Sequence, residues 1–448
     1  MHLLLASAPE NSLGRFALWL FLNNKPLGFA AGALALALIW RRDGSFRGAD
    51  RIAALALAFL CARAAVFLAT YDCWDFLVYC DTGRAMLEGT DPYASVMSQY
   101  PVHALPLFGL FARLPFRAAS ALWYAFSLAA LVMSIRLAAT LARGERHDAD
   151  ALPWCGHPTV FVAVALAGAT TWGLDAGQLV AWTTLWIYLA IDALRREKHV
   201  AAGLALAAGS LKITTFLPFL LLPFDRRHTR ALLVAGAVVA ILCAVVAPPS
   251  RLLAMQRRHV ENVAQARQVG AVNDYTFAGA YHDDLLGLEH WLYCIGLRDA
   301  RAVSAAQLGL LAVAGLGLLW DFRLRGARRD DRLLSVLLCL YACLFLYHRI
   351  YDAVIVALPM AYCLEMARTS PRIRANVYRA IASGLVLVLN FPRGGVLLSF
   401  TAWTEQAGAI GRLAQFVLLP YCTWILLASF GLLWYLDRRS LMDVGQPS

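Results

Sequence analysis

Five carboxylates stand close together in one polar stretch of an otherwise apolar chain. The stretch is YDCWDFLVYCDTGRAMLEGTDPY, residues 71–93, and aromatic side chains stand between its acids. A carboxylate held near a hydroxyl group can act as a general base and take its proton. The chemistry of this segment is therefore that of a base, unless the segment is a solvated loop whose acids are incidental.

Cationic side chains farther along the chain have the chemistry to bind an anion. His348 and Arg349 occur between two apolar runs, with Tyr351 and Asp352 beside them. Arg349 presents a fixed fork of donors for phosphate oxygens, although a charge at a membrane edge can also simply extend toward water. Lys212 lies inside an apolar run, where an isolated lysine costs about 2.5–3.5 kcal/mol. We therefore expect a phosphate or a carboxylate as its partner.

The elements that must position these groups are membrane-spanning helices. The chain has 448 residues, of which 60% are hydrophobic and 15% are charged, and its mean hydropathy is +0.60. Soluble domains contain about 25% charged residues. The apolar residues fall in blocks that are about 20 residues long, the length that crosses a bilayer. The composition therefore predicts an all-α polytopic membrane protein.

We expect about eleven spans, and eleven to thirteen in all because a broken apolar pair at 200–223 adds either two short helices or a re-entrant hairpin. Residues 13–23 form either an interfacial helix or one more span. All of 1–448 is expected to be a single membrane domain. The spans are predicted at 27–40, 52–70, 119–141, 158–171, 179–194, 231–247, 303–320, 333–347, 353–366, 379–391 and 413–436.

Basic residues indicate the orientation of these spans. Lys and Arg are dense in the short connectors at 41–51, 143–148, 195–199, 225–230, 321–332, 367–379 and 437–440. Such connectors face the cytoplasm, and they account for most of the net charge of +11, which argues against nucleic acid as a partner. The loops at 71–118 and 248–302 are then expected to face the periplasm of a bacterial inner membrane.

The first outer loop is predicted to form two short helices at the membrane surface. DFLVYCDTGRAMLEG (75–89) has an apolar side, and YPVHALPLFGLFARLPF (100–116) is apolar after its first proline. Asp75 begins the first of these helices. Its carboxylate is either a catalytic base or an N-cap, and Asp72 is the alternative base.

The order of motifs along 72–366 resembles glycosyltransferase family 87 of the GT-C superfamily. The motifs are Asp75-Phe-Leu-Val-Tyr79, Gly83-Arg84, Gly89, Asp91-Pro92-Tyr93, Tyr100-Pro101, then GQLVAW, AGLALAAGSLK and YHRIYDAV. The resemblance implies a GT-C-type bundle and a polyprenyl-phosphate sugar as the donor, with mannose most often the sugar. The segment NDYTFAG departs from the family pattern, which leaves the roles of Asn273 and Asp274 open.

The chemistry of transfer from a lipid phosphate fits these residues. The acceptor hydroxyl needs one base, the phosphate needs cationic donors, and a base opposite the leaving group gives inversion. Asp75 is the expected base, and Asp72 is the alternative. The expected ligands of the donor phosphate are Arg349, His348 and Lys212. The expected ligands of the sugar or acceptor are Tyr79, Asp91, Tyr93, Gln178, Tyr351 and Asp352.

Other polar groups keep two interpretations at this stage. Trp172 and Asp175 form an outer turn that either binds sugar or is only a polar hairpin, and Arg63 is expected to be structural or interfacial. His282, Asp283 and Asp284 lack a firm metal-ligand spacing, so no metal or cofactor is assigned and a divalent cation stays open.

The sequence thus favours an inverting glycosyltransferase that works outside the membrane on a lipid-linked or surface glycan. A transporter or flippase of a lipid-linked solute is the alternative, since broken helices and intramembrane charges suit both. The chain shows no repeat between its halves, and its acids gather in a surface loop, which favours the enzyme.

Overall fold

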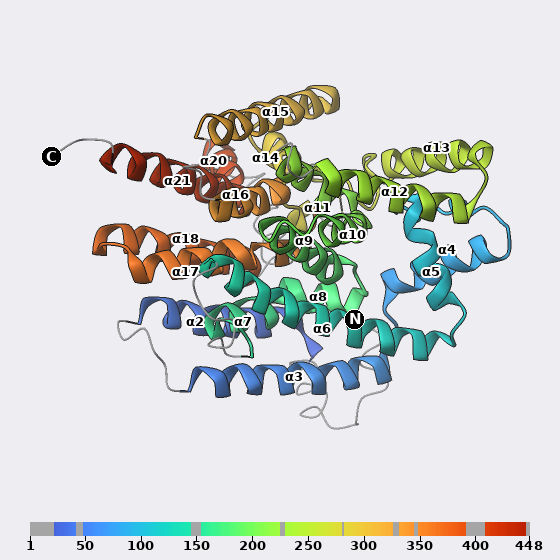
Figure 1. The fold of residues 1–448 in the computed structure, drawn as a ribbon, viewed down its shortest axis with the longest axis horizontal. Coiled ribbons are helices and arrows are strands. Elements are labelled where there is room, and N and C mark those ends of the chain that lie inside the picture. Colours follow the sequence, from blue (N-terminus) through green and yellow to red (C-terminus); the bar gives the residue numbers. More distant parts are fainter. Residues whose placement is uncertain are drawn as a thin grey trace.

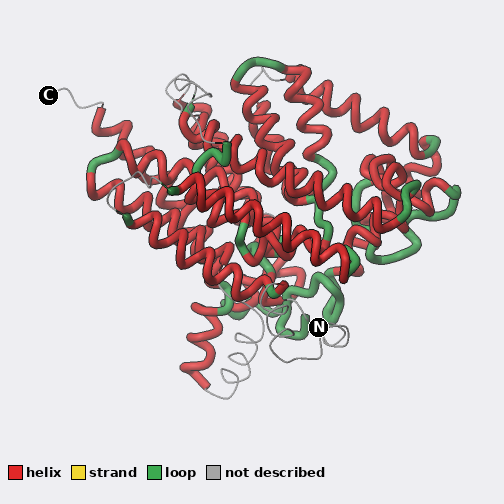
Figure 2. Tube along the Cα trace, turned by 90° about the horizontal axis from the view of Figure 1, so that it is seen from below, coloured by secondary structure: helices red, strands yellow, loops and turns green. Residues whose placement is uncertain are grey.

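Helices account for the regular structure of the chain. The computed structural model describes residues 22–41, 48–144, 154–224, 229–279, 282–325, 331–344, 348–390 and 408–444, and within these ranges it contains helices and no strand (Figures 1 and 2). This confirms the prediction of an all-α membrane protein. Of the possible span or interfacial helix at 13–23, residues 13–21 lie outside the described residues.

Five described helices are long and apolar enough to cross a membrane, or up to seven membrane crossings if each of two bent helix pairs counts as one. The five are α3 (Ala49–Thr70), α6 (Phe116–Arg143), α12 (Thr229–Val246), α15 (Ala300–Arg325) and the segment of η8 (Ile350–Val356) and α17 (Ala357–Thr369). The bent pairs are α7 (Pro158–Ala165) with α8 (Gly168–Ala176), and α20 (Gly408–Leu418) with α21 (Tyr421–Val444).

The predicted number of eleven to thirteen spans is larger than this, because several apolar blocks form shorter or interrupted helices. The shorter ones are α2 (Asn24–Trp40), α9 (Val180–Arg195), α10 (His199–Gly209) and α16 (Asp331–Leu344), while α18 (Arg372–Asn390) is long enough but carries three arginines near its start. The apolar pair at 200–223 is broken as predicted: α10 ends at Gly209, and Lys212 is the N-cap of the short α11 (Ile213–Phe216). The lysine therefore lies at a break and not within a continuous helix.

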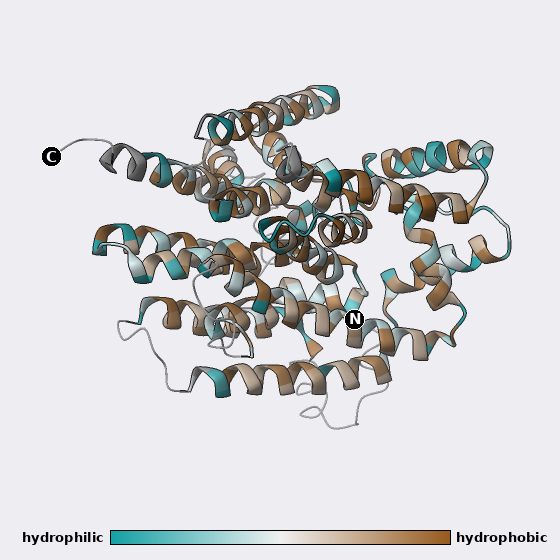
Figure 3. Ribbon diagram, in the orientation of Figure 1, coloured by the Kyte–Doolittle hydropathy of each residue, from teal (hydrophilic) through white to brown (hydrophobic). Residues whose placement is uncertain are grey.

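The long helices run roughly parallel, and the two ends of the bundle differ (Figure 1). One end carries the C-terminal end of α2, the start of α3 and the connection between α17 and α18. The other end carries α4 (Trp74–Leu87), α5 (Leu105–Ala112) and α13 (Pro249–Ala266). Hydrophilic residues are frequent along α13, whereas α3 and α6 are mostly apolar (Figure 3).

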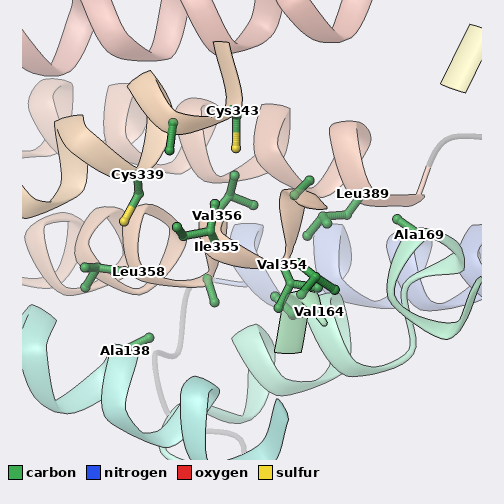
Figure 4. Close-up of a cluster of buried hydrophobic side chains, with 14 of the residues drawn as sticks. Ala138, Val164, Ala169, Cys339, Cys343, Val354, Ile355, Val356, Leu358 and Leu389 are labelled. Carbon is green, nitrogen blue, oxygen red and sulfur yellow. The ribbon is translucent and has the colours of Figure 1, made fainter. Parts of the chain in front are cut away.

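The core lies where η8 and α17 cross between neighbouring helices. In the span that they form, 89% of the apolar window is buried, against 11% in α12, whose side chains are left for lipid. In this buried cluster Ile355 and Val356 lie toward Cys339 and Cys343 of α16, and Val354 lies toward Val164 of α7 (Figure 4). The turn that begins at His348 is therefore joined directly to the most buried of these spans.

The first outer loop forms the predicted pair of short helices. Phe76, Tyr79 and Gly83 on α4 are buried, as their spacing predicts, whereas Leu87, which was expected on the same side, is exposed at the end of the helix. Gly83 lets α4 approach α5 closely, because a Cβ there would lie 2.4 Å from the carbonyl carbon of Phe108. The second outer loop contains α13 and α14 (Leu288–Cys294).

Candidate functional site

Asp75 lies in the first turn of α4, with its carboxylate turned toward the α8–α9 turn. The N-cap of α4 is Cys73, which makes no side-chain capping bond. The Asp75 carboxylate instead accepts a hydrogen bond from Gln178 Nε2. The N-cap alternative for Asp75 is therefore wrong. Asp72, the alternative base, is exposed at the surface.

The backbone of the α8–α9 turn is held where Gln178 can reach Asp75. Gly177 has a φ of +77°, and a Cβ there would lie 2.6 Å from Phe76 Cβ, so a larger residue would be strained and would clash. Trp123 Nε1 donates to the Gly177 carbonyl oxygen at 2.9 Å. This turn and the first turn of α4 thus pack directly against each other.

Two tyrosines complete the surroundings of Asp75 on the α4 side. The hydroxyl groups of Tyr79 and Tyr100 are 2.5 Å apart. Both lie near Gln178 Oε1, at 3.5 and 3.4 Å, and can donate to it. Burial raises the pKa of both hydroxyl groups well above the usual range for tyrosine, so both stay protonated hydrogen-bond donors.

A second cluster gathers around the carboxylate of Asp352. Lys212 Nζ forms an ion pair with it, and its other oxygen lies 3.1 Å from His348 Nδ1 and 3.3 Å from the backbone nitrogen of Arg349. Lys212 Nζ also lies 5.0 Å from the ring centre of Tyr351. The predicted anionic partner of Lys212 is therefore a carboxylate of the protein itself.

The second outer loop is fastened to this cluster by side chains. The Arg349 guanidinium donates to the Val272 carbonyl oxygen at 2.8 Å and to Asn273 Oδ1 at 3.3 Å. Asn273 Nδ2 in turn donates to Gln99 Oε1 at 2.9 Å. Asn273, whose role the sequence left open, thus links Arg349 to Gln99 of the first outer loop.

Backbone bonds join the same two segments. Leu286 N donates to the His348 carbonyl oxygen at 2.8 Å, and Leu285 and Arg349 form an isolated antiparallel β-bridge beside it. The segments around Val272–Asn273 and Leu285–Leu286 therefore lie against the turn that carries His348 and Arg349.

Electrostatics connect Asp75 with the Asp352 cluster. Burial raises the pKa of the Asp75 carboxyl group above its ordinary value. The hydrogen bond from Gln178 and the positive charges of Arg349 and Lys212 act in the opposite direction. A partly buried carboxylate with a raised pKa, in the field of two cations, is typical of a general base.

Some of the predicted ligands lie away from this centre. The Asp91 carboxylate forms an ion pair with Arg258 of α13, on a largely exposed part of the surface. The Tyr93 hydroxyl donates to the Tyr100 carbonyl oxygen at 2.8 Å, and Asn262 Nδ2 donates to the Tyr93 carbonyl oxygen at 3.1 Å. Tyr93 thus supports Tyr100 from behind, while Asp91 joins the loop to α13.

The described residues contain no group of three or more His, Cys, Asp or Glu side chains arranged to hold a metal ion. His282 Nδ1 lies 2.7 Å from the Gly279 carbonyl oxygen. The side chain of Asp283 lies outside the described residues. Nothing in this part of the chain assigns a metal role to the segment.

A buried ion pair behind the turn was not predicted as a pair. Arg63 of α3 contacts both oxygens of Asp175, at 2.7 and 2.5 Å. Asn24 Nδ2 and the Tyr124 hydroxyl also donate to Asp175, each at 3.3 Å. Asp175 is thus the anchor of a hairpin, the second of its two interpretations. Arg63 and Asp175 each lie among apolar residues in the sequence. This position indicates that each charge needs a partner, but it does not identify the partner.

Comparison with protein-family models matches residues 99–346 to glycosyltransferase family 87. The matched segment is more than half of the chain and contains Gln178 and Lys212, while Asp75 and Arg349 lie beyond its two ends. Searches among curated proteins and among solved structures gave no match.

Proposed function

Because this chain belongs to glycosyltransferase family 87, we propose that it transfers a monosaccharide, mannose in the first place, from a polyprenyl-phosphate donor. The acceptor is a lipid-linked or surface glycan, and the reaction takes place on the outer face of a bacterial inner membrane. Family membership also argues against the transporter alternative. The donor, the sugar and the orientation are parts of the proposal.

The observation that carries the proposal is the position of Asp75. Its carboxylate is hydrogen-bonded to Gln178 and lies within the electrostatic influence of Arg349 and Lys212. A base for the acceptor and cations for a phosphate thus lie within electrostatic reach of each other, although they come from distant parts of the chain. A sugar phosphate bound between them would have its leaving group near the cations.

Asp75 acts in one step in this mechanism. It takes the proton of the acceptor hydroxyl group as that oxygen attacks the anomeric carbon of the sugar. The bond between this carbon and the phosphate oxygen breaks, and the electron pair leaves with the polyprenyl phosphate. Attack opposite the leaving group inverts the anomeric configuration. No acid is required, because the phosphate is a stable leaving group.

Arg349, Lys212 and His348 supply the phosphate side of the proposed site. Two cations and the single carboxylate of Asp352 leave one positive charge in the cluster. This charge favours a phosphate, and more so as negative charge develops on it in the transition state. Asp352 then has the role of orienting Lys212 and His348 and not that of a sugar ligand.

Aromatic and polar groups around these charges suit the sugar. Trp172 and Tyr351 are in edge-to-face contact, with their ring centres 5.7 Å apart, and Tyr79 packs edge to face with Tyr100. We assign Tyr351, beside the partly exposed Trp172, to the donor sugar. Tyr79 is fully buried and bonded to Tyr100, so it supports the site from within and is not a sugar ligand. Asp91 lies farther out on the loop and is kept for the acceptor, whereas the buried Tyr93 only supports Tyr100.

The test is a release assay with purified protein. The protein is incubated with a panel of synthetic polyprenyl-phosphate monosaccharides and an acceptor glycolipid, and free polyprenyl phosphate and elongated acceptor are measured. Nucleotide sugars serve as the control donors. Release from at least one lipid donor, with inversion at the anomeric carbon, supports the proposal. Transfer from nucleotide sugars alone would contradict it.

A further inference from the structure

The side-chain amide of Gln178 is hydrogen-bonded to other residues of the protein. Its Nε2 donates to Asp75, and its Oε1 is within reach of the hydroxyl groups of Tyr79 and Tyr100. The residue is only 5% exposed. An amide has two donor hydrogens and one acceptor oxygen, so most of this capacity is already used, and a sugar ligand would have to displace these partners.

The turn that carries Gln178 is anchored on its other side by charge. Asp175, three residues earlier, is 3% exposed and accepts bonds from Arg63, Asn24 and Tyr124. Arg63 is completely buried in α3. Because an unpaired charge at that depth is costly, the pair holds α8 against α3. The backbone between the anchor and Gln178 is set by Gly177, whose carbonyl oxygen accepts the bond from the Trp123 indole.

We propose that Gln178 is a positioning residue whose amide fixes the orientation of the Asp75 carboxylate, and that the Arg63–Asp175 ion pair holds the turn from which Gln178 reaches it. The inference rests on the proposed function, since it deepens the role given to Asp75. It replaces the sugar-binding role that the sequence suggested for Gln178.

Asp75 has a defined set of charged and titratable neighbours. Arg349 and Lys212 act on it as cations, and Tyr79 and Tyr100 as neutral hydroxyl groups, while Asp352 is paired with Lys212. The bond from Gln178 stabilises the ionised form of Asp75. Removing this donor must therefore raise the pKa of Asp75 further, and the base will be protonated at a higher pH.

The first experiment replaces Gln178→Met, which keeps the length of the side chain and removes its polar atoms. We expect kcat to fall about tenfold and the acid limb of the pH–rate profile to move up by about one pH unit, the size of a lost bond to a charged group. Affinity for the lipid donor should stay unchanged. Gln307→Met is the matched control, because Gln307 is equally buried but lies on α15, and it should leave the profile in place.

The second experiment tests whether Arg63 acts through Gln178. Arg63→Lys keeps the charge but loses the fork that holds both oxygens of Asp175. If the pair acts through the turn, the double variant Arg63→Lys/Gln178→Met should lose no more of kcat than Gln178→Met alone. Independent structural effects would instead multiply. Thermal unfolding of each variant shows that the compared proteins are folded.

A third measurement separates this inference from the proposed function. Labelling of Asp75 by a hydrophobic carbodiimide, which reacts with protonated carboxyl groups, is followed by mass spectrometry against pH without substrate. An upward shift of the midpoint in Gln178→Met supports the inference even if the donor panel fails. An unchanged pH midpoint of Asp75 labelling, or a donor affinity that falls while kcat stays unchanged, would overturn the inference. Gln178 would then be assigned to sugar binding again.

Discussion

Replacing Lys212→Met should destabilise the protein, although it removes a charge from an apolar region. The insertion cost of about 2.5–3.5 kcal/mol applies to a lysine without a partner. Lys212 instead pairs with Asp352, and the two side chains are 12% and 3% exposed. Removing one member of a buried pair typically costs about 3–5 kcal/mol, because the other charge is left uncompensated.

The bonds that remain to Asp352 place the effect at the lower end of that range. The carboxylate keeps the contacts with His348 Nδ1 and with the backbone nitrogen of Arg349. We therefore expect a loss of about 3 kcal/mol for Lys212→Met. The double variant Lys212→Met/Asp352→Asn should recover most of it, because neither member then carries a charge.

The assay is denaturant-induced unfolding of the purified protein in detergent, with the single variants and the double variant measured side by side. Lys198→Met is the control, since Lys198 is an exposed lysine between α9 and α10, and it should change stability by less than about 0.5 kcal/mol. A Lys212→Met variant that is as stable as the wild type, or a double variant that simply adds two losses, would refute this account of the pair.

Three further predictions concern the site and its orientation. Arg349→Lys keeps the charge but loses the fork, so donor affinity should fall about tenfold or more in a binding assay, and unchanged affinity would remove Arg349 from the phosphate site. A cysteine placed at Val96 should react with a membrane-impermeant thiol reagent in spheroplasts, and one at Ile373 should not; both positions are exposed, and the reverse pattern would put the site in the cytoplasm. The transfer rate should fall as pH drops through a pKa above 3.8, because burial raises the pKa of Asp75, and a rate limb at or below the ordinary aspartate value would contradict this.

The sequence predicted the local features of the fold well. The amphipathic spacing of Phe76, Tyr79 and Gly83 predicted α4 and its buried face, and the position of Lys212 within an apolar run predicted both a broken helix and an anionic partner. These features could be predicted because they depend on residues that are close together in the chain.

The pairings across the site could not be predicted in this way. Arg63 and Lys212 both needed an anion, and Asp175 and Asp352 both offered one, but the actual pairs are 112 and 140 residues apart. Local patterns do not decide between the two arrangements. The bond from Gln178 to Asp75 spans 103 residues and depends on the packing of the α8–α9 turn against α4. Only the three-dimensional arrangement reveals it.

The most direct test of the central claim is the transfer rate of Asp75→Asn with the best lipid donor, compared with Asp81→Asn. Asp81 lies on the same helix, but it is exposed and pairs with Arg84 at the surface. Loss of a general base should lower the rate of Asp75→Asn about 10²–10⁴-fold, with donor affinity retained, while Asp81→Asn stays near the wild type. A turnover near that of the wild type in Asp75→Asn would contradict the assignment and would make His348, whose Nε2 has no partner among the described residues, the next base to examine.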